Sequence, residues 1–194
     1  DLNDVKIVVY DVDDVIIGLN ESAHKIAGID LTKRKYFDVK KETALLTTEQ
    51  MKGLYRAYND VETFKKAVIY RGAEDIFSIE DTNKARVYLH SLSYQQEIAD
   101  YKVELLSKLY PDIPDDRIML ECGVSKSVIN EVDILVEDCL DNIRRSKARI
   151  ANIMIKKAYN RPENYGTTLK ELRAIEVDNL EQANEVVRRL VLEA

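Results

Sequence analysis

The run Val5-Lys6-Ile7-Val8-Val9-Tyr10 is followed at once by Asp11-Val12-Asp13-Asp14. A short, mostly apolar and β-branched run of this kind is typical of a strand buried on both faces of a parallel sheet. Comparable runs recur along the chain, at 85–90, 117–121, 133–136, 150–155 and, as a short edge strand, 174–177. Segments with helical periodicity separate them. The alternation of strands and helices predicts an α/β fold with a mainly parallel sheet between helices.

Three of the intervening segments predict helices that pack on this sheet, at 94–109, 140–147 and 179–192. The last of them has Asp178 in position to cap its first turn. We expect the buried faces to be Ile98, Tyr101, Leu105 and Leu109 in the first helix and Leu180, Ala183, Val187 and Leu190 in the last. This spacing places each set on one side of its helix.

The segment 16–69 interrupts this alternation, because it is too long for an ordinary connection between two strands. It is polar and mainly helical in pattern, with Thr47-Thr48-Glu49-Gln50 resembling a capping box and a second short helix expected at 61–67. We interpret it as a small helical cap subdomain (residues 16–69) inserted into a core made of residues 1–15 and 70–194. The alternative is an elaborated helical crossover without catalytic consequence.

Composition narrows the class of protein. The chain has 194 residues, of which 45% are hydrophobic and 33% charged, as in a globular protein. No apolar run reaches membrane-spanning length, and the polar start does not read as a signal peptide. The two cysteines cannot form a disulfide framework, so a cytoplasmic setting is the simpler expectation. The net charge of −6 makes binding to nucleic acid unlikely and leaves a small phosphorylated substrate open.

Polar side chains follow several of the predicted strands at their carboxyl ends, where ligands bind in such sheets. They are Asp11 and Asp13 after the first strand, Ser91 after the second, and Glu137 and Asp138 after the fourth, with Lys126 in a short helical stretch before the fourth. Each alone could be a turn former, a helix cap or a surface group. Together they crowd carboxylates that repel one another unless a cation intervenes. Oxygen-only ligands favour a hard cation, and Mg²⁺ suits a site that substrate phosphate completes.

These motifs, in this order, resemble the haloacid dehalogenase (HAD) superfamily of phosphatases. The first motif is a strand that ends in Asp11-Val12-Asp13, and the second is a strand that ends in Ser91. Lys126 matches the third motif, and Glu137-Asp138 matches the acidic pair of the fourth. Lys126-Ser127 ahead of Asp133-Ile134-Leu135, Asn142-Ile143 after Asp138, Tyr159-Asn160-Arg161 and the insertion after the first motif are most similar to the 5′(3′)-deoxyribonucleotidase group.

The resemblance implies a Rossmann-like fold and a Mg²⁺-dependent phosphomonoester hydrolase that acts on a nucleoside 5′- or 3′-monophosphate. Asp11 would be the nucleophile that forms an aspartyl-phosphate, and Asp13 the general acid and base. Ser91 and Lys126 would bind the phosphate. The Mg²⁺ ligands would be Asp11, the backbone carbonyl of Asp13, Glu137 (directly or through water) and Asp138. The cap would cover the crevice, and its Tyr36, Phe37, Tyr55 and Tyr58 are candidates to stack on a base, although such aromatic residues more often pack in a core.

Two residues depart from the pattern of the superfamily, and they leave other functions open. Asp14 stands where Gly is usual, and Glu137 is one methylene longer than the usual Asp. One alternative is therefore a phosphatase-like binding or regulatory protein without catalysis. Another is a phosphatase that acts on a polynucleotide or protein end, with a basic lip from 33–35 or 40–41.

The remaining histidines and cysteines receive no catalytic role. His24 and His90 are too scattered for a metal cluster, and His90 should point away from Ser91 along an extended strand. Cys122 and Cys139 are expected to be small packing residues near strand ends. The oligomeric state does not follow from the sequence.

Overall fold

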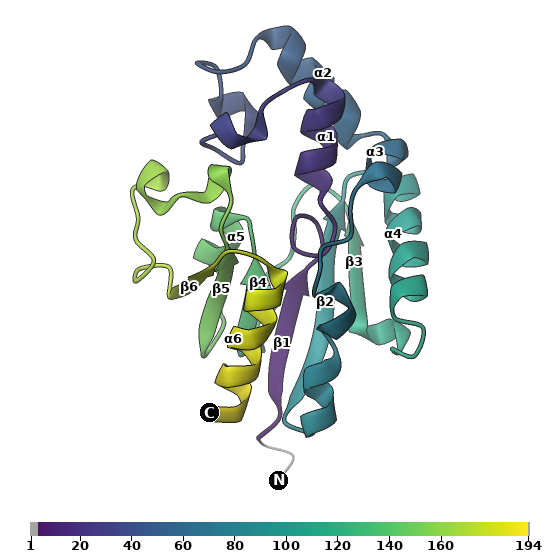
Figure 1. Ribbon diagram of the computed structural model, residues 1–194, viewed down its shortest axis with the longest axis vertical. Coiled ribbons are helices and arrows are strands. Elements are labelled where there is room, and N and C mark those ends of the chain that lie inside the picture. Colours follow the sequence, from purple (N-terminus) through teal and green to yellow (C-terminus); the bar gives the residue numbers. More distant parts are fainter. Residues whose placement is uncertain (1–3, 194) are drawn as a thin grey trace.

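Six parallel strands form the centre of the molecule in the computed structural model, which describes residues 4–193 (Figure 1). Their order across the sheet is β3-β2-β1-β4-β5-β6. The strands are β1 (Lys6–Asp11), β2 (Ala85–Ser93), β3 (Ile118–Cys122), β4 (Ile134–Glu137), β5 (Ala151–Ile155) and β6 (Ala174–Val177). The predicted α/β class and all six predicted strands are confirmed, with ends that shift by no more than three residues.

The strand order reverses at β1, because β2 and β3 extend from one of its edges and β4 to β6 from the other. Asp11 is level with His90 on β2, and Tyr10 is level with Val136 on β4. Residues 11 and 137 therefore lie at neighbouring strand ends on the two sides of the reversal. In an open parallel sheet this crevice is where ligands bind.

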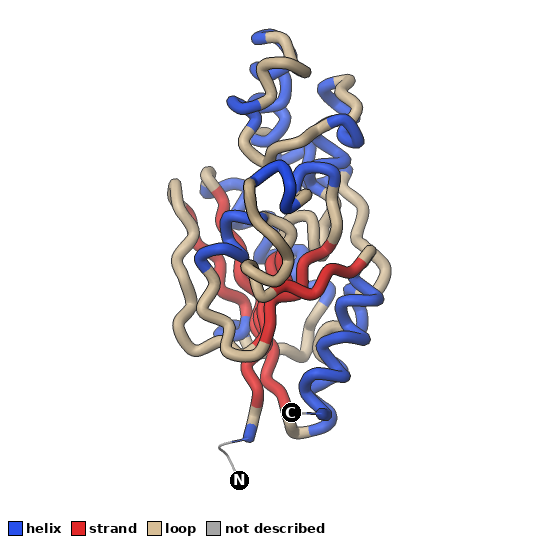
Figure 2. The backbone as a smooth tube through the Cα atoms, turned by 90° about the vertical axis from the view of Figure 1, so that its left-hand side faces the viewer, coloured by secondary structure: helices blue, strands red, loops and turns tan. Residues whose placement is uncertain are grey.

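Helices and irregular segments cover both faces of the sheet (Figures 1 and 2). The helices are α1 (Leu19–Ala27), α2 (Thr48–Tyr58), α3 (Val61–Lys66), α4 (Gln96–Leu109), α5 (Leu140–Arg145) and α6 (Leu180–Glu193). Side chains of α4, α6 and the turns at 73–82 bury one face, around Val8, Val87 and Ile134. The other face packs on α5 and on the irregular segment 123–133.

Helices α1, α2 and α3 lie together beyond the carboxyl ends of the strands, at the top of Figure 1. Helices α1 and α2 bury a small apolar cluster with Ala23, Leu54 and Ala57 at its centre, whereas Phe64 of α3 packs with Ile98 of α4. Helix α2 begins with the predicted capping box. The Thr47 side chain accepts from the Gln50 N–H, and the Gln50 side chain accepts from the Thr47 N–H. The assignment of this segment as a cap with boundaries at 16 and 69 stays a prediction.

The buried face of α4 differs from the predicted one. Its buried residues are Ile98, Ala99, Lys102 and Leu106, whereas Tyr101, Leu105 and Leu109 are only partly buried. The apolar pattern was misleading because a lysine occupies the centre of the buried face, where it forms an ion pair with Asp13. Hydrophobic periodicity cannot reveal such a position.

Two further local predictions are wrong. Asn179, not Asp178, caps α6, because its side chain accepts from the Gln182 N–H at 2.9 Å. Lys126 lies in an irregular segment rather than in a short helical stretch. In α6 itself, Leu180, Ala183 and Val187 are buried as expected, and Val191 takes the place predicted for Leu190.

Candidate active site

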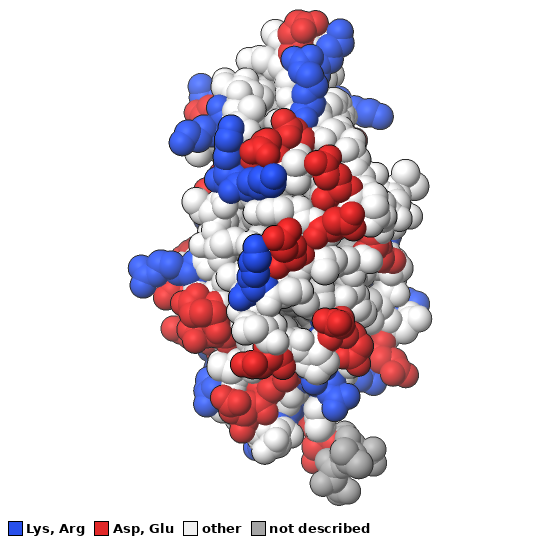
Figure 3. Space-filling view, turned by 90° about the vertical axis from the view of Figure 1, so that its right-hand side faces the viewer, with Lys and Arg blue, Asp and Glu red and all other residues white. Residues whose placement is uncertain are grey.

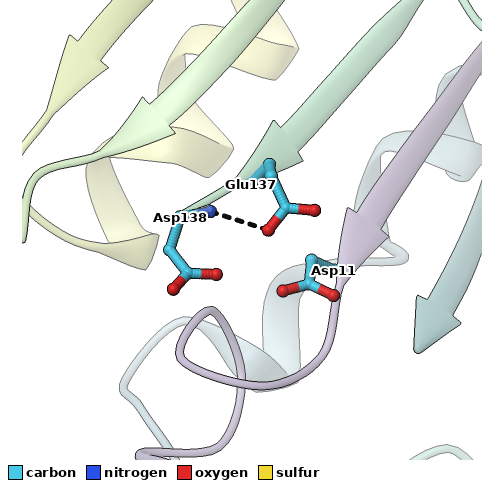
Figure 4. Close-up of side chains that lie close together, drawn as sticks. All are labelled: Asp11, Glu137 and Asp138. Atoms are coloured by element: carbon cyan, nitrogen blue, oxygen red, sulfur yellow. Dashed lines mark hydrogen bonds between the residues drawn. The ribbon is translucent and has the colours of Figure 1, made fainter. Parts of the chain in front are cut away.

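Three buried carboxylates meet where β1 and β4 end. Asp11 is the last residue of β1, Glu137 is the last residue of β4, and Asp138 follows it. Each offers one oxygen, and these oxygens all lie within 4.8 Å of one another. Figure 4 shows the three side chains directed toward a common space. The paired register of the two strands thus brings together residues that are far apart in the sequence.

Lys126 supplies the positive charge beside this cluster. Its ammonium donates to Asp11 Oδ1 at 2.6 Å and to Glu137 Oε2 at 3.3 Å, and its side chain is only 10% exposed. Burial alone would lower the pKa of Lys126, but the charges of Asp11 and Glu137 outweigh it and raise that pKa above its usual value. The group therefore stays cationic next to Asp11.

The pKa values of the three carboxylates differ because their surroundings differ. Burial raises the pKa of Asp11 to about 6, and the charge of Glu137 adds to that effect. Burial likewise raises the pKa of Asp138 well above its usual value, helped by the charge of Asp14. Burial acts the same way on Glu137, but Lys126 and hydrogen bonds to the carboxylate outweigh it, so its pKa is lowered. The cluster is thus short of positive charge, which a bound cation would supply.

Asp13 and Ser91 meet on the other side of Asp11, and a buried lysine joins them. Lys102 Nζ donates to Asp13 Oδ2 at 2.7 Å and lies 3.1 Å from Ser91 Oγ. Burial raises the pKa of Asp13, and the charge of Lys102 opposes that rise. Asp13 Oδ1 has no hydrogen-bond partner among residues 4–193. One oxygen of Asp13 is therefore held in place by Lys102, while the other is buried without a hydrogen-bond partner among these residues.

Asp14 occupies the glycine position without opening the turn. Its backbone has φ of 64°, in the left-handed region that Gly, Asn and Asp tolerate best. Its buried carboxylate accepts the Asn20 N–H at 2.7 Å, in the first turn of α1, whose N-cap Gly18 offers no side chain. Burial raises the pKa of Asp14 to about 8, and the hydrogen bond from Asn20 opposes the rise. Asp14 thus links the turn that follows β1 to the first helix beyond it.

Residues after β5 hold Asp138 and also contact the segment 16–69. Tyr159 donates its hydroxyl to Asp138 Oδ2 at 2.7 Å, and Asn160 Nδ2 donates to the Asp138 carbonyl at 2.8 Å. The Tyr159 ring makes an edge contact with Phe37, with 5.7 Å between the centroids. The Phe37 N–H donates to Tyr165 Oη at 2.8 Å. One loop therefore orients a proposed metal ligand and meets the helical segment above it.

The donor set fits a hard divalent cation. Every candidate ligand is an oxygen, and no His or Cys belongs to the acidic group found within residues 4–193. Burial, together with neighbouring carboxylates, raises the pKa of Asp11 and of Asp138, so an added cation would favour their ionised forms. Glu137 is more fully occupied, because Oε1 accepts the N–H groups of Asp138 and Cys139, at 3.0 and 3.1 Å, while Oε2 accepts from Lys126. Asp11 and Asp138 thus have more freedom to bind a metal ion than Glu137 has.

The sequence missed Lys102, Tyr159 and Asn20 as parts of this site. A lysine in a helix is usually a surface residue, and Lys102 gave no other signal. The sequence indicates Tyr159 and Asn160 only through the resemblance to the deoxyribonucleotidase group, which gives them no role. Cys139 is buried at the start of α5, as expected, but Cys122 is exposed and does not pack in the core.

The surface charge of the molecule does not indicate a binding partner. On the face that carries α3 and α4, acidic and basic side chains are interspersed (Figure 3). Arg34 is buried, so the suggested basic lip at 33–35 loses its central residue. Among residues 4–193, no helix has the length and apolar character required to cross a membrane.

Several solved structures share this architecture. A protein of Bacteroides vulgatus assigned as a beta-phosphoglucomutase is 15% identical, with 98% of this chain and 90% of that chain covered and a TM-score of 0.59. A HAD hydrolase of Entamoeba histolytica (family IA, variant 3) is 14% identical, with 97% and 100% covered and a TM-score of 0.56. A haloacid dehalogenase-like hydrolase of Xanthomonas campestris is also 14% identical, with 97% of both chains covered and a TM-score of 0.56. These likenesses establish the HAD fold.

The sequence defines the group within that fold. Residues 5–191 match the family described as 5′ nucleotidase, deoxy (pyrimidine), cytosolic type C protein (NT5C). The chain therefore belongs to this nucleotidase family of the HAD superfamily and is a phosphatase. A search of curated proteins gives no match.

Proposed function

We propose that this enzyme is a Mg²⁺-dependent phosphomonoester hydrolase that acts on a nucleoside monophosphate through an aspartyl-phosphate on Asp11. The observation that carries the proposal is the convergence on Asp11: Lys126 lies 2.6 Å from its Oδ1, and Glu137 and Asp138 complete an oxygen cluster. Membership of the nucleotidase family supports the substrate class.

In the first step, a carboxylate oxygen of Asp11 attacks phosphorus, and the bond from phosphorus to the leaving oxygen breaks. Asp13 gives its proton to that leaving oxygen through the unpartnered Oδ1. In the second step, Asp13 takes a proton from water, which attacks the aspartyl-phosphate and releases phosphate and free Asp11. The raised pKa of Asp13 suits this alternation of acid and base.

Lys126 and Ser91 stabilise negative charge on the phosphoryl oxygens during both steps. Lys126 reaches them from the side of Asp11, and Ser91 donates its hydroxyl from the side of Lys102. We propose Asp11, the Asp13 carbonyl and Asp138 as Mg²⁺ ligands, with Glu137 direct or through water. When bound, Mg²⁺ neutralises the carboxylates and orients the phosphate.

The segment 16–69 supplies the wall for the leaving group, and we propose that it acts as a cap over the crevice. Among its four aromatic candidates, Tyr58 has a hydrogen-bonded path to the catalytic turn, because its hydroxyl donates to Asn20 Oδ1 and the Asn20 N–H donates to Asp14. Phe37 is 44% exposed beside Tyr159 and has a free surface for stacking. Tyr36 packs edge-on against Tyr165. The exposed surface of Phe37 supports a leaving group with an aromatic base.

The proposal is tested by Asp11→Asn in hydrolysis of an aryl phosphate and of a panel of nucleoside 5′- and 3′-monophosphates and sugar phosphates. With Mg²⁺ we expect the parent enzyme to prefer nucleotides and the variant to be slower by about 10³-fold or more. Asp141→Asn, on the exposed side of α5, is the matched control and should retain full activity. Near-parent turnover of Asp11→Asn, or equal parent rates with and without Mg²⁺, would contradict the proposal.

A further inference from the structure

Lys126 is held by a segment that has almost no structure of its own. The residues 124–129 form neither helix nor strand. Within them, the Ser127 N–H is the only backbone group with a hydrogen-bond partner among residues 4–193. A cavity of about 40 Å³ lies beside them, lined by Ser127, Ile129, Leu135 and Asn142 among others. Packing alone therefore does not fix the position of the segment.

The single backbone partner is Glu121, near the end of β3. Its Oε2 accepts the Ser127 N–H at 3.0 Å and also pairs with His90 Nε2 at 2.7 Å. His90 is 5% exposed in its side chain, whereas Glu121 is 34% exposed. The imidazole therefore provides a rigid, buried partner that fixes the carboxylate next to the residue that follows Lys126.

The position of His90 explains why this contact reaches the catalytic centre. His90 is level with Asp11 across β1 and β2, and its side chain lies on the opposite face of β2 from Ser91, which contacts Lys102 instead. The row of contacts from His90 through Glu121 to Ser127 thus begins at the strand end beside Asp11. It ends one residue from the ammonium that contacts Asp11.

We infer that Glu121, oriented by His90, is a positioning residue that holds Lys126 on Asp11, an inference that rests on the proposed role of Lys126. A lysine side chain has considerable rotamer freedom, so its ammonium reaches one position only if its backbone is fixed. The carboxylate of Glu121 supplies that restraint through the Ser127 N–H. Neither His90 nor Glu121 needs to contact the substrate.

A double-mutant cycle with Lys126→Met tests this inference. We expect Glu121→Ala to lower kcat/KM for an aryl phosphate in Mg²⁺ by about 10- to 100-fold, as is typical for loss of an orienting partner. Glu121→Gln keeps an acceptor oxygen and should recover most of the rate. In the Lys126→Met background, Glu121→Ala should have no further effect. Glu131→Ala, on an exposed residue of the same irregular segment, is the matched control and should behave as the parent.

A second readout does not depend on turnover. The affinity for inorganic phosphate, measured by titration calorimetry, should fall in Glu121→Ala and not in Glu131→Ala. If Glu121→Ala does not fold by circular dichroism, Glu121→Asp, which withdraws the oxygens by one methylene, takes its place in the cycle.

The outcomes distinguish a failure of the proposed function from a failure of the role inferred for Glu121. An inactive parent enzyme, or a fully active Lys126→Met variant, would overturn the proposed function itself. With both of those results as expected, an equal effect of Glu121→Ala in the two backgrounds would overturn the inference alone. A Glu121→Gln variant as slow as Glu121→Ala would also overturn it.

Discussion

The molecule has two buried polar networks, and they are built in opposite ways. In the segment 16–69, Arg34 donates to the neutral His24 ring and to two backbone carbonyls, and it lies 3.6 Å from Glu42. One cation thus faces one anion. At the strand ends, carboxylates outnumber ammonium groups, with Asp11, Asp13, Asp14, Glu137 and Asp138 against Lys102 and Lys126.

From this difference we infer that the balanced network is structural and that the unbalanced network binds a ligand. A balanced network satisfies its own charges and needs no ligand. An unbalanced one costs folding free energy and persists where a ligand completes it. Burial, with the charge of Glu137, raises the pKa of Asp11 to about 6, and burial raises the pKa of Asp14 to about 8, so ionising these groups costs free energy in the folded protein. The predictions that follow disturb the two networks separately.

Loss of Lys102 should disturb the unbalanced network strongly, although less than the loss of Asp11 itself. Lys102→Met removes the cation that holds Asp13 and contacts Ser91, so we expect kcat to fall by about 10²-fold, the usual contribution of a positioned acid or base. Lys108→Met, an exposed lysine of the same helix, serves as the control. Steady-state kinetics of both variants would check this, and equal rates would show that Lys102 has no part in catalysis.

Removing one carboxylate from each network should change stability in opposite directions. Glu42→Gln leaves the buried Arg34 without its counter-charge, so the free energy of unfolding should fall by about 3 kcal/mol. Asp14→Asn keeps the acceptor for Asn20 and tolerates the left-handed backbone. It also removes a carboxyl group whose pKa is raised by burial to about 8, so that its ionisation at pH 7.5 favours the unfolded chain. Without metal we expect it to gain on the order of 1 kcal/mol. Urea unfolding at pH 7.5 measures both; a loss in Asp14→Asn equal to that in Glu42→Gln would contradict the distinction.

A third expected effect is a dependence of stability on pH that comes from His24. Arg34 Nη1 donates to His24 Nε2, so Nδ1 carries the proton and donates to the Asn20 carbonyl. Burial lowers the pKa of His24 to about 4, whereas the unfolded value is about 6.5. A lowered folded pKa means that the contribution is complete above pH 6.5 and is lost as the pH falls from 6.5 toward 4.

The His24→Gln variant isolates that contribution, because glutamine keeps a neutral donor and acceptor and does not titrate. Between pH 6.5 and 4, the parent should lose about 2 kcal/mol more than the variant does. Parallel stability curves for the two proteins over this range would show that His24 is protonated in the folded state.

The sheet and the acidic strand ends could be predicted from the sequence because each depends on local patterns. Runs such as Val5–Tyr10 bury both faces of a strand, and the carboxyl ends of parallel strands meet at one edge. Asp11, Glu137 and Asp138 therefore had to be neighbours once the strand order was known. The strand order alone accounts for the proximity of these three carboxylates.

The parts that escaped prediction depend on tertiary contacts between unlike residues. Lys102 occupies a buried helix position only because Asp13 and Ser91 lie opposite it. Lys126 needs no helix because Glu121 fixes the backbone of Ser127. The hydrophobic periodicity of a sequence does not predict such contacts between distant polar residues.

The most direct test of the central claim is to trap the covalent enzyme. Parent protein turning over an aryl phosphate with Mg²⁺ is quenched in acid, reduced with borohydride and digested, and its peptides are identified by mass spectrometry. An acyl phosphate on Asp11 predicts conversion of that residue to homoserine, and none in Asp11→Asn. Reduction at a different carboxylate, or no reduction during measured turnover, would contradict the assignment of Asp11 as the nucleophile.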